Sequence, residues 1–113
     1  MIITLIRITI DAENREEILS VARSLLGLVR AQPGCIHFEI CHNIDDVNTL
    51  AIVEEWESQE DLDRYIRSDE YRKVLALIDF SAEPPEIRFN TVSHTGGLEV
   101  IEAARGACET TLE

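Results

Sequence analysis

Residues 2–10 are mostly β-branched and apolar, with a polar residue at intervals, and this pattern predicts a β-strand. In residues 12–31 the spacing changes to three and four, which predicts an amphipathic helix. Its apolar stripe consists of Ile18, Val21, Ala22, Leu25, Leu28 and Val29. Asp11 is expected to cap this helix, and Pro33-Gly34 is expected to end it.

Two further alternating segments, residues 35–42 and 49–57, flank a polar stretch with turn chemistry, so they predict an antiparallel hairpin. We expect one face of each strand to point towards the helices. These positions are Ile36, Phe38, Ile40 and His42 in the first strand, and Leu50, Ile52, Glu54 and Trp56 in the second.

A second helical region follows, in two segments. Ser58 and Asp61 have capping-box spacing, and Ser68 is expected to cap the second segment. The apolar positions are Leu62, Tyr65 and Ile66, then Tyr71, Val74, Leu75 and Ile78. Pro84-Pro85 ends the region, and residues 86–94 predict a last strand.

The order β-α-β-β-α-β predicts an α+β fold of the ferredoxin-like kind with an antiparallel sheet. Residues 1–95 make up this domain, and Gly96-Gly97 separates it from a tail, residues 96–113. Residues 98–105 predict a short helix, and the last eight residues are expected to fray. The tail can serve as an arm over a partner or as a lid.

Two helices cover only one face of a four-stranded sheet. The opposite face is expected to carry apolar residues mixed with charged ones, which are Ile3, Leu5, Cys35, Cys41, Ala51, Val53 and Val92, with Arg7, His37, Glu39 and Glu55. Such a face predicts an interface, and the simplest cover is a second copy of the sheet. The sequence therefore predicts a homodimer.

The 113 residues carry a formal net charge of −12, which disfavours nucleic acids and anionic membranes as partners. The chain has no apolar run of the ~18 residues that span a bilayer, and no leader pattern, so we expect a cytoplasmic protein. Cys35, Cys41 and Cys108 are expected to be free thiols, and no spacing typical of a metal site occurs.

Two short motifs resemble a known family. Pro33-Gly34-Cys35-x-x-Phe38-Glu39 resembles the PGxxxYE segment of the antibiotic biosynthesis monooxygenase domain. Glu54-Glu55-Trp56-Glu57-Ser58, followed by Leu62 and Tyr65-Ile66-x-Ser68, is similar to the family's E-x-W-x-S…hL-x-S signature. The resemblance covers residues 1–95 and implies a dimeric α+β barrel.

The resemblance also implies a pocket between sheet and helices, in which family members oxidise electron-rich aromatics such as quinols with molecular oxygen and often without a cofactor. We therefore expect a cofactor-independent monooxygenase that acts on a small quinol-like or polyketide-like aromatic. Such a reaction needs a base of suitable pKa and hydrogen-bond donors in a dry pocket.

Three residues are candidates for catalysis. Trp56 matches the family's tryptophan and either lines the pocket or simply fills the core. Glu54 is either a general base or a structural hydrogen-bond partner of Tyr65. His42 has the pKa of a base near neutrality, but a surface position at a strand end explains it equally simply.

Five residues are candidates for binding the substrate, namely Phe38, Tyr65, Tyr71, Ile6 and Ile52. The sequence also departs from the family. Haem-degrading members have polar residues where Ile6 and Leu75 stand, and anthrone-oxidising members have polar residues where Ile52 and Leu62 stand. We therefore expect neither haem degradation nor an anthrone oxidation that uses polar residues at positions 52 and 62. Two alternatives remain open: a non-catalytic dimeric protein that binds a small ligand, and an isomerising enzyme with His42 as proton shuttle.

Overall fold

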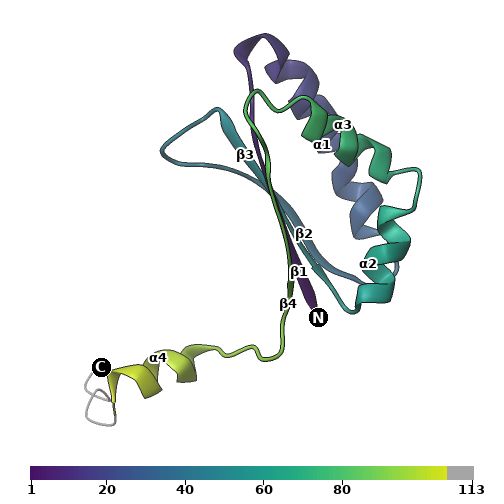
Figure 1. Cartoon of the computed structure of the whole chain (residues 1–113). Helices are drawn as coiled ribbons and strands as arrows, with labels where there is room; N and C mark the ends of the chain where they lie inside the picture. The colour runs from purple at the N-terminus through teal and green to yellow at the C-terminus, as the bar shows by residue number, and fades with distance from the viewer. Residues whose placement is uncertain (107–113) are drawn as a thin grey trace.

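The computed structural model describes residues 1–106 and has the predicted ferredoxin-like order, followed by the short helix predicted over residues 98–105 (Figure 1). The elements are β1 (Ile2–Thr9), a 3-10 turn η1 (Ala12–Asn14), α1 (Arg15–Arg30), β2 (Cys35–His42), β3 (Thr49–Trp56), α2 (Gln59–Ile66), α3 (Tyr71–Asp79), β4 (Glu86–Thr91) and α4 (Leu98–Arg105). The α+β prediction is confirmed. The predictions for Cys108 and for fraying beyond Gly106 lie outside the described residues.

The four strands form one antiparallel sheet in the order β2-β3-β1-β4. The two strands of the predicted hairpin, β2 and β3, are neighbours in this sheet. β1 lies next to β3 in the middle of the sheet, and β4 lies at the edge. Helices α1, α2 and α3 cover one face, and the described chain leaves the other face open (Figure 1). We call these the inner and the outer face.

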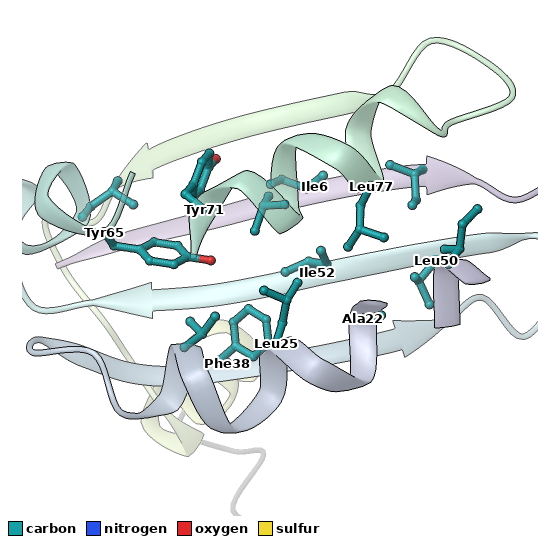
Figure 2. Close-up of a cluster of buried hydrophobic side chains, with 14 of the residues drawn as sticks. Ile6, Ala22, Leu25, Phe38, Leu50, Ile52, Tyr65, Tyr71 and Leu77 are labelled. Carbon is teal, nitrogen blue, oxygen red and sulfur yellow. The ribbon is translucent and has the colours of Figure 1, made fainter. Parts of the chain in front are cut away.

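Period-two alternation places the apolar residues of β1 and β3 on the inner face, where they pack against the helices (Figure 2). The buried cluster contains Ile2, Ile6, Ile8, Phe38, Leu50, Ile52 and Trp56 from the strands, and Ile18, Ala22, Leu25, Val29, Leu62, Tyr65, Tyr71, Val74 and Leu77 from the helices. A single core thus joins all three helices to the sheet.

The predicted faces at the start of β2 are wrong, because a β-bulge interrupts the strand between Cys35 and His37. The extra residue reverses the alternation. Cys35 lies opposite Trp56 and packs against the core, although it was expected on the outer face. Ile36 occupies the bulge and is 50% exposed, although it was expected to point inwards.

Ser58 caps α2 as predicted, because its hydroxyl accepts a hydrogen bond from the Asp61 backbone N–H at 3.1 Å. Two other capping predictions are wrong. The Asp11 side chain makes no capping hydrogen bond. The Ser68 hydroxyl donates to the Tyr65 carbonyl at 2.6 Å and so serves the end of α2, since α3 begins only at Tyr71.

The buried stripes of the helices are narrower than predicted. Leu28 of α1 and Leu75 of α3 are 39% and 50% exposed, so both face solvent. Leu77 is buried instead of Leu75, because α3 is short and meets the sheet along Tyr71, Val74 and Leu77. The prediction for α1 is otherwise confirmed at its central positions.

Helix α4 stands apart from the rest of the molecule (Figure 1). Each of its residues is exposed, including the apolar Leu98, Val100 and Ile101. The segment after β4 turns towards the outer side of the sheet, away from the other helices (Figure 1). In the described chain no helix has the length and apolar character needed to cross a membrane.

Candidate active site at a buried carboxylate

The sheet holds one carboxylate inside the core. Glu54 and Trp56 are two apart in β3, so both side chains point to the inner face, as predicted. Thr4 of β1 and Phe38 of β2 are the cross-strand neighbours of Glu54 on either side. Only 1% of Glu54 is exposed, and Thr4 and Trp56 are completely buried. Three neighbouring strands thus supply the walls around this group.

One carboxylate oxygen of Glu54 is fully engaged and the other is not. Oε1 accepts hydrogen bonds from Thr4 Oγ1 and from Trp56 Nε1, each at 2.9 Å. Among the described residues, no group hydrogen-bonds to Oε2 or to the nearby Tyr65 hydroxyl. A buried polar atom left unpaired costs about 1–3 kcal/mol. These two atoms belong to neighbouring side chains, and the Tyr65 hydroxyl interacts with the carboxylate closely enough to lower the pKa of Glu54.

Two tyrosines complete the surroundings of the carboxylate. Tyr65 of α2 stacks on Trp56 with ring centroids 4.8 Å apart and an interplanar angle of 23°. Tyr71 of α3 meets Tyr65 edge-on, at 5.0 Å and 85°. Both tyrosines lie between the helices and the sheet (Figure 2).

The burial of this cluster changes the acidity of each member. Burial raises the pKa of Glu54, although the hydrogen bonds from Trp56 and Thr4 and the Tyr65 hydroxyl pull it down. Burial and then the Glu54 charge raise the pKa of Tyr65 and bring that of Tyr71 to about 12. The tyrosines are therefore neutral donors at physiological pH, and Glu54 is a stronger base than an ordinary carboxylate when it is ionised.

A surface hollow of about 300 Å³ lies beside this cluster, on the far side of β2. It is lined by Arg30, Cys35, Ile36, His37 and Phe38. Two of these lining residues, Phe38 and Cys35, are the cross-strand partners of Glu54 and Trp56.

The walls of this hollow are held in place by Arg30 of α1, whose guanidinium donates to the Phe38 carbonyl at 3.0 and 3.2 Å. Burial, followed by the charge of Glu54, raises the pKa of the Cys35 thiol. The thiol is thus a neutral, weakly polar wall, and Arg30 contributes a positive charge to the lining of the hollow.

The structure brings most of the predicted site residues together but leaves one apart. Ile6 and Ile52 are paired across β1 and β3, and they share the buried cluster with Phe38, Trp56 and Tyr65. Tyr71 belongs to the same cluster. These residues enclose Glu54 from the sheet and from the helical side.

His42 lies elsewhere, at the end of β2 opposite Leu50. It is four residues beyond Phe38, which corresponds to about 13 Å at the rise of a β-strand. Its exposed side chain lines a second hollow of about 180 Å³ that is otherwise formed by Leu19, Ala22, Arg23, Leu26, Ile40 and Leu50. His42 and Glu54 therefore belong to separate parts of the molecule.

Sequence reasoning missed Thr4, Cys35 and Arg30. Thr4 is a polar residue at an inward position of an apolar strand, and that was a usable signal. Cys35 was assigned to the wrong face because the bulge was not foreseen. Arg30 gave no sequence signal. Within the described residues no group of three His, Cys, Asp or Glu side chains is arranged to hold a metal ion.

Comparison with known families gives one clear match. The model of the family described as antibiotic biosynthesis monooxygenase matches residues 1–77, so the resemblance stated from the two motifs is confirmed. An uncharacterized protein of Synechocystis is 21% identical over 89 residues. That match covers 78% of this chain, and the chain spans about 60% of that relative's length.

Solved structures share the fold. A crystal structure described as an antibiotic biosynthesis monooxygenase is 18% identical, covers 83% of this chain and 100% of its own, and has a TM-score of 0.74. A protein from Mycobacterium tuberculosis is 15% identical, covers 85% of this chain and 98% of its own, and has a TM-score of 0.76. A conserved protein from Methanosarcina mazei is 23% identical, covers 79% of this chain and 89% of its own, and has a TM-score of 0.73.

Proposed function

This chain belongs to the antibiotic biosynthesis monooxygenase family, and from that membership and the buried Glu54 we propose that it oxidises a small electron-rich aromatic with molecular oxygen. The substrate class is a quinol or a polyketide-like ring, and the reaction uses no cofactor. The expected place of the reaction is the cytoplasm.

The observation that carries this proposal is the asymmetric carboxylate of Glu54. Thr4 and Trp56 hold Oε1, so Oε2 is oriented and free to exchange a proton. Oε2 removes the proton from an activated ring carbon or hydroxyl, and the resulting anion is rich enough in electrons to reduce oxygen. For a polyketide-like ring, a ring CH₂ and O₂ then give a carbonyl and one water. For a quinol with a free ring C–H, the quinol and O₂ give a hydroxyquinone and one water, so both oxygen atoms are accounted for in each case.

The walls of the site supply the remaining requirements. The neutral Tyr65 hydroxyl, unpaired beside the carboxylate, donates to the oxygen of the substrate anion. The ring stacks against the Trp56 and Tyr65 pair. The hollow beside β2 is the proposed side of entry, and Arg30, which lines it, favours an anionic phenolate.

Oxygen consumption with a panel of hydroquinones and anthrones tests this proposal. Glu54→Gln keeps the shape and the acceptor oxygen at Oε1 but removes the base, so turnover should fall by roughly 100-fold or more. Glu57→Gln, an exposed neutralisation three residues away, is the matched control and should retain full activity. Equal rates for Glu54→Gln and the native protein would contradict the role of Glu54.

One observation favours a second function, that of a non-catalytic binding protein. The core around Glu54 is closed, because Glu54, Trp56 and Tyr65 are each at most 1% exposed. In that case aromatic compounds would raise the melting temperature through the hollow beside β2, with no oxygen consumption. The same panel, measured by both methods, separates the two functions.

A further inference from the structure

The second surface hollow, which we call the His42 hollow, lies between α1 and the end of β2 and has a volume of about 180 Å³. The buried Ala22 and Leu50 form its floor, and the half-buried Leu19, Leu26 and Ile40 form its sides. Ala22 and Leu50 lie at the opposite end of the buried cluster from Tyr65 (Figure 2). The His42 hollow is therefore separate from the site around Glu54.

The two polar side chains that line this hollow, Arg23 and His42, have no partner within the described chain. Both are exposed, and within residues 1–106 neither makes a hydrogen bond or an ion pair. The positions one helical turn to either side of Arg23 hold leucine, serine or glycine, so the helix offers it no carboxylate. The guanidinium therefore keeps all its N–H donors, and the imidazole has an N–H donor in either protonation state.

The charge of the His42 hollow is opposite to that of the molecule. The chain has 22 acidic and 10 basic side chains, yet no carboxylate lines this hollow and Arg23 does. An apolar hollow with a positive charge at its mouth is complementary to a molecule that has an apolar body and an anionic group. A cavity of about 150 Å³ lined by aliphatic and aromatic side chains accommodates benzene, so this hollow has room for one such ring.

We propose that the His42 hollow binds a small organic acid. The apolar body of the acid packs between Leu26 of α1 and Ile40 of β2, where it removes apolar surface from water. The carboxylate accepts two hydrogen bonds from the Arg23 guanidinium, which presents paired donors, and one from the His42 imidazole. The acid is bound and not converted, so the site is a binding site in addition to the one proposed for catalysis.

Titration with benzoate, followed by two-dimensional NMR of the backbone amides, tests this site. Benzoate should cause saturable shifts at Ala22, Leu26 and Ile40, with a dissociation constant of about 1 mM, which is reasonable for a ligand of this size. Benzamide has nearly the same shape but no charge, and it should bind roughly tenfold more weakly. Acetate has the charge but no ring, and it should cause no saturable shift at these amides.

Substitutions at the mouth of the hollow test the two donors. Arg23→Gln should raise the dissociation constant of benzoate roughly threefold to tenfold and change that of benzamide little, because it removes the charge but not the apolar surface. His42→Ala should raise it by a smaller factor, about twofold to threefold, since a single donor is lost. Both side chains are exposed, so both variants should fold, and circular dichroism checks this.

Arg67→Gln is the matched control. Arg67 is exposed at the end of α2 and does not line the hollow, so the substitution changes the net charge equally and should leave benzoate binding unchanged. An equal loss of affinity in Arg67→Gln and Arg23→Gln would overturn the proposal, as would equal affinities for benzoate and benzamide. Shifts centred on Arg30 and Phe38, or no saturable shift, would also overturn it. None of these measurements involves oxygen consumption, so the result is independent of the monooxygenase proposal.

Discussion

Glu54 and Glu55 are neighbours in β3, yet the strand turns one carboxylate into the core and the other to the outer face. The inner face is dry, and Glu54 there has two hydrogen-bond donors on one oxygen and a raised pKa. The outer face is partly exposed to solvent, and the ion pairs on it lie at the surface. The same chemical group therefore has a different proton affinity on the two faces, because burial, partly offset by hydrogen bonds, raises the pKa of Glu54.

The largest expected difference between the faces concerns packing, at the adjacent residues Ile6 and Leu5. Ile6→Ala should lower the free energy of unfolding by about 2–5 kcal/mol, because it opens a cavity in the buried cluster. Leu5→Ala removes a half-buried side chain from the outer face. Urea denaturation at low protein concentration should show a clearly smaller loss for Leu5→Ala, and equal losses would contradict the difference between the faces.

The next effect concerns the donor to the buried carboxylate. Thr4→Val keeps the shape of the side chain but removes the hydroxyl that donates to Glu54 Oε1. The variant should lose about 1–3 kcal/mol of stability and raise the pKa of Glu54 further. Thr91→Val, at an exposed position of β4, is the control and should change stability by at most about 0.5 kcal/mol. Chemical denaturation at pH 7 compares the two.

The third test follows the raised pKa of Glu54 through the pH dependence of stability. The folded chain holds the Glu54 proton to a higher pH than the unfolded chain. The contribution of Glu54 to stability is therefore greatest below its ordinary pKa of 4.5, and it is lost as the pH rises through the raised pKa. The loss is about 1.4 kcal/mol for each unit by which the pKa is raised. Glu54→Gln lacks this proton exchange.

Denaturation of the native chain and of Glu54→Gln between pH 4.5 and 8 isolates the contribution of that carboxyl. As the pH rises, the unfolding free energy of Glu54→Gln should increase relative to that of the native chain. Parallel curves for the two proteins would show that Glu54 ionises normally. Glu57→Gln is the exposed control, and its curve should follow that of the native chain.

The smallest effect is expected on the outer face. The His37 imidazole pairs with the carboxylate of Glu39, and both side chains are nearly half exposed. His37→Gln should change the unfolding free energy of the monomer by no more than about 0.5 kcal/mol, because exposed ion pairs contribute little. Thermal denaturation in dilute solution checks this, and a large loss would mean that the outer face stabilises the monomer.

Much of this arrangement was predictable from local patterns. The alternation in β3 correctly placed Glu54 and Trp56 on the helix-facing side, and the spacing in α1 correctly identified Ile18, Ala22 and Leu25. The Tyr65 hydroxyl lies near Glu54 and lowers its pKa, but it does not meet the geometry of a full hydrogen bond, so a structural pairing of the two stays a prediction. The assignment of catalytic roles to Trp56, Glu54 and His42 stays a prediction.

The remaining details needed the folded chain. The Ile36 bulge inverted the faces at the start of β2, and a single inserted residue leaves no trace in hydrophobic spacing. The Ser68 hydroxyl had two backbone groups within reach, and the short turn between α2 and α3 decided which it bonds. His42 matched the chemistry of a base, but its place along β2 put it beyond reach of Glu54.

The sequence by itself determined the order of the elements and the direction in which most side chains point, because helix and strand periodicities are properties of neighbouring residues. Only the tertiary structure decided that Thr4, fifty residues away, donates to Glu54, and that Glu39 and Arg88 share one row on the outer face. Strand register arises from pairing between distant segments, and it is this register that builds both the buried carboxylate and the charged face.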